Sequence, residues 1–366
     1  MTAWKARPWR AFFVTFASTA MASIRILIPS GAGAPGFAGI ARCLRAGSAE
    51  LRILAGDQNP QAYGRSLADE FRLMPPSDAP DYAQQVLQWA IEARVDLIFP
   101  VTTRELLPLA EKAEAFAEAG IALPISTAAA LQIALDKGKT STKALELGLP
   151  VPEFKLAQNR YEMAAAAREL GYPQKRVCFK PCLGNGSRGF GIIDEQGHHI
   201  PYGSEKAGIL PLRLEEWMPR WPEEGNPVEQ IVAEFLPGRE YSSDALFQHG
   251  RCLGVWVRSR DKMIGGISVA GECVEHSGIA QACQQLGESL QLHGLIGFQH
   301  REDAQGHAKL MEINPRVQGT TSAWEGMGLN LPWALVQMSL QPERPLDLNN
   351  PQNGQRFVRF WDERTL

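Results

Sequence analysis

Glu312, Asn314 and Arg316 occupy alternate positions of the segment MEINPR, which ends an apolar run near the C-terminal end of the chain. Alternate side chains of a β-strand point to the same face, so the Glu312 carboxylate and the Asn314 amide are expected to converge. One carboxylate with amide oxygens suits a hard cation such as Mg²⁺, which keeps several waters and takes other ligands from substrate phosphates. Pro315 ends the strand and leaves Arg316 at its rim, where a guanidinium can bind a phosphate or a carboxylate through two hydrogen bonds.

A fourth residue extends this set, because Gln299 lies in the segment GFQHR, which has the pattern of a neighbouring strand. Taken alone, Glu312 is better explained as a surface strand end that forms a salt bridge. Together with a glycine-rich loop that could bind phosphate, the four residues favour a functional site.

That loop is the stretch CLGNGSRGFG, in which Gly184, Gly186 and Gly189 have the spacing G-x-G-x-x-G. Strand-like runs precede and follow it, so a glycine hairpin is predicted. Its backbone N–H groups can wrap phosphates with no Cβ in the way. Lys180 precedes the loop and Arg188 lies within it, and both are suited to clamp a phosphate. The alternative is an exposed hairpin with solvated charges.

An earlier glycine stretch, Gly31, Gly33 and Gly36, follows a strand and opens a helix, and Asp57 ends the next strand. This is the context of a dinucleotide-binding fingerprint. The same turn also serves other anion-binding sheets, or merely permits a tight strand-to-helix connection. NAD binding is therefore one interpretation and not the favoured one.

A hinge is predicted in AEFLPGREYSSD, where Pro237 and Gly238 follow the apolar pair Phe235 and Leu236. An apolar hinge with backbone polar groups could hold a planar base. A carboxylate nearby, such as Glu240, could accept hydrogen bonds from ribose hydroxyls.

Composition sets wider limits. The chain has 366 residues, 45% hydrophobic and 21% charged, which indicates an ordinary globular protein of two or three domains. A net charge of −3 gives no basic field for nucleic acid. The six cysteines show no zinc-binding spacing, so we expect reduced thiols in a cytoplasmic protein.

The order of elements predicts an α/β domain followed by an α+β part. The stretch 24–46 has the pattern of a strand, a glycine turn and a helix, and further apolar runs lie at 50–57 and 95–103. Helical patterns at 82–94 and 106–120 complete an alternation that is typical of an open parallel sheet. We expect an N-terminal Rossmann-like domain over 23–125. A linker helix (126–150) and a small lid are expected within 126–233, a C-terminal region with antiparallel strands over 234–345, and a tail over 346–366.

Residues 1–22 are ambiguous. Basic residues before AFFVTFASTAMAS resemble a short export signal, but the apolar part is much too short to span a bilayer. The favoured interpretation is an unstructured extension, or a start wrongly placed ahead of Met21. No other segment approaches a transmembrane run.

The motifs, taken in order, resemble the ATP-grasp superfamily over about residues 24–341. The successive landmarks are DKGKT, CFKPCLGNGSRGFG, AEFLPGREYSSD, GFQ and MEINPR. The resemblance is strongest to one synthetase unit of the carbamoyl-phosphate synthase large subunit and to stand-alone carboxylate–amine ligases. It implies a Rossmann-like N-terminal domain, a small lid and a C-terminal domain, with ATP between the last two.

The resemblance also implies a role for each motif. Lys139 and Lys180 would contact the ATP phosphates, as would the loop with Gly184, Gly186, Ser187 and Gly189. The hinge that holds adenine would consist of Glu234, Phe235 and Leu236. Glu240 would contact the ribose. Glu312, Asn314 and Gln299 would bind Mg²⁺ or Mn²⁺, although many relatives have an acidic residue at the position of Gln299. Arg316 would steady the transferring phosphoryl group, and Arg258 or Arg260 the acyl phosphate.

The activity implied is ATP-dependent joining of a small carboxylic acid, such as an amino acid or peptide, to an amine, with release of ADP and phosphate. Alternatives are a carboxylase or carbamoyl-phosphate-synthase-like enzyme that uses bicarbonate, and a non-catalytic ATP-binding protein. Thr102, Thr103 and Glu105 are weak candidates for the non-nucleotide substrate. A homodimer is compatible with the family, whereas neither nucleic acid nor a membrane is expected as a partner.

Overall fold

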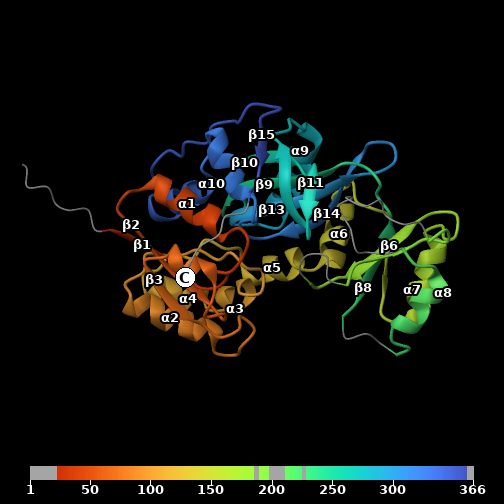
Figure 1. Cartoon of the computed structure of the whole chain (residues 1–366), viewed down its shortest axis with the longest axis horizontal. Helices are drawn as coiled ribbons and strands as arrows, with labels where there is room; N and C mark the ends of the chain where they lie inside the picture. The colour runs from red at the N-terminus through yellow and green to blue at the C-terminus, as the bar shows by residue number, and fades with distance from the viewer. Residues whose placement is uncertain (1–22, 185–188, 198–210, 225–227, 361–366) are drawn as a thin grey trace, which may run out of the picture.

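The computed structural model describes residues 23–184, 189–197, 211–224 and 228–360. The N-terminal domain lies against the C-terminal sheet, and a smaller lid stands apart from both at the far end of the molecule (Figure 1). Residues 1–22, for which an extension or an export signal was considered, lie outside the described part. No helix in the described part is long and apolar enough to span a membrane.

The N-terminal domain contains a parallel sheet in the order β3-β2-β1-β4, which confirms the predicted α/β arrangement. Its strands are β1 (Ile24–Ile28), β2 (Leu51–Asp57), β3 (Glu70–Leu73) and β4 (Leu97–Ile98). Its helices are α1 (Phe37–Gly47), η1 (Tyr63–Ser66), α2 (Tyr82–Glu92), α3 (Leu106–Ala110) and α4 (Ala113–Glu118). The strand expected at 95–103 is only two residues long, the helix expected at 106–120 is divided, and β3 was not predicted.

Two helices, and not one, connect this domain to the lid: α5 (Ala128–Ala134) and α6 (Lys137–Glu146). Thr127 caps α5 by accepting a hydrogen bond from the Ala130 N–H at 3.3 Å. The break lies at Asp136, whose carboxylate caps α6 by accepting from the Lys139 N–H at 3.0 Å. The Lys137 N–H donates to the Cys182 carbonyl at 3.0 Å, so the first turn of α6 is fixed beside the start of the glycine hairpin.

The lid is an antiparallel sheet in the order β5-β8-β6-β7 with helices on it. The strands are β5 (Phe154–Ala157), β6 (Val177–Pro181), β7 (Gly191–Ile193) and β8 (Gln230–Glu234). The helices are α7 (Arg160–Glu169), α8 (Leu214–Trp217) and η2 (Met218–Arg220). Since β6 and β7 pair antiparallel, the glycine stretch between them connects a hairpin, as predicted.

The C-terminal part is built on an antiparallel sheet in the order β10-β9-β13-β14, as its strand patterns predict. Its strands are β9 (Glu240–Gln248), β10 (Arg251–Ser259), β13 (Gly294–Glu302) and β14 (Ala308–Asn314). A small sheet contains β11 (Lys262–Ile264), β12 (Ile267–Glu272) and β15 (Arg356–Val358), so the expected tail contributes a strand. The helices are α9 (Ser277–Ser289), η3 (Thr321–Met327) and α10 (Leu331–Leu340).

The hydrophobic cores divide the molecule differently from the sheets. Ile26 and Phe37 of the N-terminal domain share one core with Leu246, Leu295 and Trp324 of the C-terminal part. The lid has a core of its own, formed by residues between 157 and 232. The first two regions are therefore held together by common apolar burial, whereas the lid is a separate packing unit.

Candidate active site

Glu312 lies at the centre of a group of polar side chains on β13 and β14. The strand register places Gln299 directly opposite Glu312. The Asn314 Nδ2 donates to Glu312 Oε1 at 3.2 Å. All three side chains line one cavity, so the structure brings the predicted metal ligands together.

Two lysines approach the same carboxylate. Lys180 Nζ lies 3.7 Å and Lys137 Nζ 4.0 Å from Glu312 Oε2, and all three side chains are largely buried. Burial raises the pKa of Glu312. The charges of Lys180 and Lys137 and the Asn314 hydrogen bond lower this pKa by more than burial raises it, so the pKa of Glu312 lies below its usual range. Burial lowers the pKa of Lys137, opposed in part by Glu312.

Lys137 approaches Glu312, whereas Lys139, the lysine named from the sequence, does not. Lys139 is exposed on α6, because two helical positions differ by about 200° around the axis and only one of the two side chains can face Glu312. The Lys137 Nζ also donates to the Gly184 carbonyl at 2.8 Å. The sequence signal that could have found Lys137 is Asp136, a helix cap directly before it.

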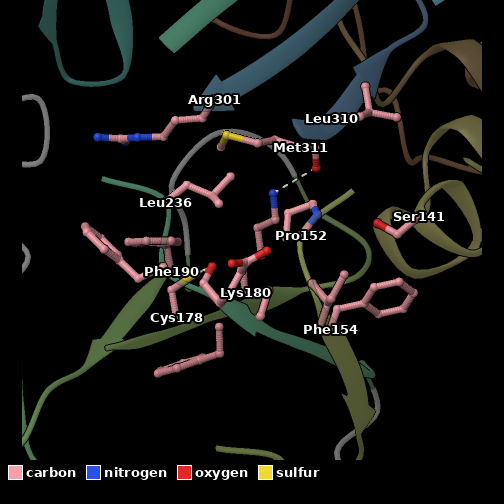
Figure 2. Close-up of a pocket in the computed structure, with 15 residues that line it drawn as sticks. Ser141, Pro152, Phe154, Cys178, Lys180, Phe190, Leu236, Arg301, Leu310 and Met311 are labelled. Carbon is pink, nitrogen blue, oxygen red and sulfur yellow. Dashed lines mark hydrogen bonds between the residues drawn. The ribbon is translucent and has the colours of Figure 1, made fainter. Parts of the chain in front are cut away.

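A narrow apolar cavity of about 50 Å³ lies between the lid and the C-terminal sheet. Figure 2 shows Phe190 and Cys178 on the lid side and Leu310 and Met311 opposite. Lys180 rises from β6 across this cavity, and its Nζ donates to the Met311 carbonyl at 3.2 Å (Figure 2). Arg301 also lines the cavity, and the mostly apolar lining with these two cations suits a planar base that carries phosphates.

The predicted hinge, residues 234–236, lines this cavity. The Glu234 carboxylate is occupied by protein partners, because it accepts from the Glu153 N–H at 2.9 Å and forms an ion pair with Lys309. The chain at Phe235 and Leu236 therefore fits the hinge role better than the Glu234 side chain does.

Glu240, expected to contact ribose, does not line the apolar cavity. Its buried carboxylate lies 3.3 Å from Arg260 Nε and 3.4 Å from Arg301 Nη1. A ribose hydroxyl would have to share this carboxylate with two guanidinium groups, so the structure favours a role in holding Arg260 and Arg301.

A second, polar cavity of about 240 Å³ lies on the other side of Glu312. The C-terminal sheet contributes the predicted metal ligands and three predicted arginines, Arg258, Arg260 and Arg316. The N-terminal domain contributes the loop at 34–37 and Val101, so the first glycine loop faces this cavity.

The glycine at position 36 serves domain packing. A Cβ there would lie 2.5 Å from the Gly319 Cα, so any side chain would collide with the backbone of the C-terminal part. The Gly33 N–H donates to the Asp57 carboxylate at 2.8 Å, which occupies the acidic residue of the apparent dinucleotide fingerprint. These contacts argue against NAD at this loop.

The two candidate arginines, one on β10 and one just after it, are both buried. Arg258 is 1% exposed and forms an ion pair with Asp244, which also accepts from the Trp324 indole N–H at 2.8 Å. Arg260 donates to the Ser242 hydroxyl at 3.2 Å and to the Gly266 carbonyl at 2.7 Å. Each arginine is thus held beside the polar cavity by a buried carboxylate, Arg258 by Asp244 and Arg260 by Glu240.

Arg316 links the site to the N-terminal domain. Its Nε donates to the Thr103 hydroxyl at 3.3 Å, and its Nη2 donates to Asn314 Oδ1 at 3.4 Å. Burial lowers the pKa of Arg316, opposed by Glu312 and other carboxylates. Thr103 therefore reaches the site by holding Arg316.

Glu105 is fully buried and cannot touch a ligand in this structure. Its carboxylate accepts from the N–H groups of Val101 and Thr102 at 2.9 and 2.7 Å and from the Tyr82 hydroxyl at 2.8 Å. Burial raises its pKa to about 7, although these hydrogen bonds oppose the rise. Glu105 therefore shapes the loop that carries Thr102 and Thr103.

Only the edges of the glycine hairpin are described. Gly184 and Gly189 have φ angles of +152° and +74°, which residues with a side chain rarely adopt. Gly186 and Ser187, two of the predicted phosphate-binding residues, lie outside the described residues.

The donor set fits Mg²⁺. In the described part of the chain, no group of three or more His, Cys, Asp or Glu side chains could hold a metal ion. One carboxylate with two amides is instead a sparse oxygen set, which suits an ion that keeps waters and shares substrate phosphates. The adjacent Lys137 and Lys180 could neutralise the same phosphates.

Comparison with known proteins places the chain in a class by sequence and by fold. Residues 226–360 match the family described as "ATP-grasp in the biosynthetic pathway with Ter operon", and residues 39–124 match the "PylC-like, N-terminal domain" family. The arginine-specific large chain of carbamoyl phosphate synthase from Bacillus subtilis is 25% identical over 210 residues, which are 57% of this chain and 19% of that protein. The chain thus spans about a fifth of the length of this relative.

Solved structures have the same fold. The ADP complex of PurK, N5-carboxyaminoimidazole ribonucleotide synthetase, superposes with a TM-score of 0.65 at 16% identity over 90% of this chain and 79% of that chain. The biotin carboxylase domain of Hydrogenobacter thermophilus 2-oxoglutarate carboxylase also has a TM-score of 0.65, at 14% identity over 91% and 72% of the two chains.

The family match and the fold identify an ATP-grasp domain, which confirms the resemblance noted in the sequence. More narrowly, the chain joins a PylC-like N-terminal domain to an ATP-grasp domain, and it is homologous to the carbamoyl-phosphate synthase large chain.

Proposed function

We propose that the chain is an ATP-dependent carboxylate–amine ligase that forms an acyl phosphate and then an amide. The observation that supports this most is the junction of two unlike cavities. Lys180 lines the apolar cavity, Glu312 lines the polar cavity, and their charged atoms lie 3.7 Å apart. A nucleotide in the first cavity would present its terminal phosphate to an acid in the second.

In the first step, a carboxylate oxygen of the acid attacks the γ-phosphorus of ATP, and the bond to the β–γ bridging oxygen breaks. The products are an acyl phosphate and ADP. Lys137 and Lys180 neutralise the phosphate oxygens, and Arg316 orients the transferring group from the polar side. Mg²⁺ held by Gln299, Glu312 and Asn314 would reduce the negative charge of the phosphates when bound.

In the second step, an amine attacks the acyl carbon and inorganic phosphate leaves, so that an amide forms and the amine loses a proton. Positioning and charge neutralisation supply the catalysis, which explains a site with lysines and arginines and no evident nucleophile. The glycine hairpin would exclude water, because an acyl phosphate hydrolyses easily.

Bicarbonate is a second candidate for the acid. One structure with the same fold is described as a complex with MgADP and bicarbonate, and a homologue is named as a carbamoyl phosphate synthase chain. Bicarbonate would give carboxyphosphate in the same first step. ADP release that depends on bicarbonate alone would favour this route over an organic acid.

The test is ADP release with Mg-ATP and pooled amino acids, with and without each candidate acid, in bicarbonate-free buffer. We expect ADP release that requires one acid and one amine and is lost in E312Q. The control E275Q changes an exposed glutamate outside both cavities. Tight binding of Mg-ATP without turnover under every condition, bicarbonate included, would favour a non-catalytic nucleotide-binding protein.

A further inference from the structure

The polar cavity contains an arginine that the proposed chemistry does not use. Arg359 follows β15 and lines the same cavity as Glu312 and Arg316. Its N–H donates to the Val269 carbonyl at 2.7 Å, which fixes the backbone against β12. The end of the chain thus closes one wall of the site.

The hydrogen bonds of Arg359 are incomplete. Its Nη2 donates to the Pro35 carbonyl at 2.5 Å, at the loop before α1. Its Nη1 is buried and has no hydrogen-bond partner among the residues that the structure describes. A buried guanidinium nitrogen without a partner is costly, because burial removes its water. The direction of its pKa agrees, since burial lowers the pKa of Arg359 despite Tyr63 nearby.

The arginines of this cavity fall into two pairs. Arg258 and Arg260 are neutralised by Asp244 and Glu240. Within the described part of the chain, Arg316 and Arg359 bond only to neutral acceptors and form no ion pair. The cavity therefore has two guanidinium groups with no carboxylate of the described chain within ion-pair distance, and the proposed mechanism uses only Arg316 of the two.

We propose that Arg359 binds a second anionic group, a carboxylate or a phosphate, on the substrate that fills the polar cavity. A guanidinium offers two parallel N–H donors to either group, and pairing would satisfy the buried Nη1. The substrate class is then a small molecule with an anionic group remote from the carboxylate that is activated. This inference rests on the proposed function for the identity of the site, and it deepens that function by naming the substrate class.

The test measures anion binding by calorimetry with and without saturating Mg-ADP. The probes are inorganic phosphate, glutarate and, as a monoanion, acetate. We expect phosphate, glutarate or both to bind the wild type with a Kd below about 1 mM, which corresponds to about −4 kcal/mol. Binding of phosphate alone would indicate a phosphorylated substrate, and binding of glutarate alone a dicarboxylate.

Three variants assign the binding to Arg359. R359Q should weaken it at least about tenfold, and R359K should retain part of it, because lysine keeps the charge but loses the planar fork. R356Q changes an exposed arginine at the start of β15, three positions before Arg359, and should bind as the wild type does. If R359Q does not fold, the comparison of anion binding between R359K and the wild type decides the test.

Two results would overturn the proposal: no binding of phosphate or glutarate to the wild type at about 10 mM, or equal binding by the wild type, R359Q and R359K. Mg-ADP binding separates this failure from that of the proposed function. If the wild type does not bind Mg-ADP, the ligase assignment is contradicted. The anion measurement without nucleotide still decides the role of Arg359 in that case.

Discussion

The two cavities that meet at Glu312 are lined by side chains of different chemical character. The apolar cavity lies between two sheets, and its lining has mostly aromatic and aliphatic side chains with Lys180 reaching across. The polar cavity lies between the N-terminal loop at 34–37 and the C-terminal sheet, and four arginines line it. The first suits a ligand that is shared by many enzymes of one fold, and the second suits a ligand that distinguishes them.

The difference indicates where specificity resides. An apolar slot recognises a base mainly by shape and by backbone hydrogen bonds, so its side chains can change within limits. Fixed guanidinium groups recognise the number and position of negative charges. Variants on either side of Glu312 should therefore separate nucleotide binding from acid binding.

The largest effect is expected at the junction itself. E312A should reduce ADP release by about 10³-fold, or about 4 kcal/mol at the barrier, because it removes the only carboxylate among the predicted metal ligands. Steady-state ADP formation measures this, with E275A as the control and a melting curve to verify folding. Turnover within tenfold of the wild type would remove Glu312 from the site.

The second effect concerns the wall of the polar cavity. Glu105 has a pKa raised from the usual 4.5 to about 7, so the folded state binds a proton that the unfolded state has lost. The unfolding free energy should therefore fall as pH rises from about 4.5 to about 7, by about 3 kcal/mol in the wild type relative to E105Q. Urea unfolding at about pH 5 and about pH 8 measures the difference. Parallel pH profiles for the two proteins would contradict this account of Glu105, and the exposed Glu118 gives the control E118Q.

The third prediction compares two lysines on one helix. K137M should lower turnover about 10²-fold, equivalent to about 3 kcal/mol, because its ammonium lies 4.0 Å from Glu312. K139M should remain within about twofold, since Lys139 is exposed. Kinetics of both variants with Mg-ATP provide the measurement. The reverse order would restore Lys139 as the phosphate ligand.

The smallest effect is expected on the apolar side. F190A should weaken Mg-ADP binding about tenfold, or about 1.4 kcal/mol, by removing an aromatic wall of the slot. Anion binding in the polar cavity should not change. Calorimetry measures both, with F360A, an exposed phenylalanine, as the control. A change in anion binding as large as that in ADP binding would mean that the cavities are not separate.

The sequence predicted what depends on local periodicity. The strand period of two placed Glu312 and Asn314 together, and the glycine stretch with strands on both sides predicted the hairpin between β6 and β7. The parallel sheet followed from continuous apolar runs that alternate with helical patterns, and the antiparallel sheet from the series of strand-like runs after residue 230.

The remainder depends on helical phase and on distant partners. One residue, Asp136, divides the expected linker helix and decides that Lys137 faces the site. Glu240 is paired with Arg301, which lies 61 positions away, and no local sequence pattern predicts that contact. Arg359 was assigned to a tail, because a three-residue edge strand with exposed ends has almost no periodic signal.

The close approach of Gly36 to Gly319 has a consequence for how such a protein can diversify. Backbone meets backbone there, so the spacing of the two walls is set by atoms that every amino acid shares. Side chains on either flank can then be exchanged without altering the width of the gap. A scaffold jointed in this way can acquire new substrates by changing its lining while its frame keeps the same dimensions.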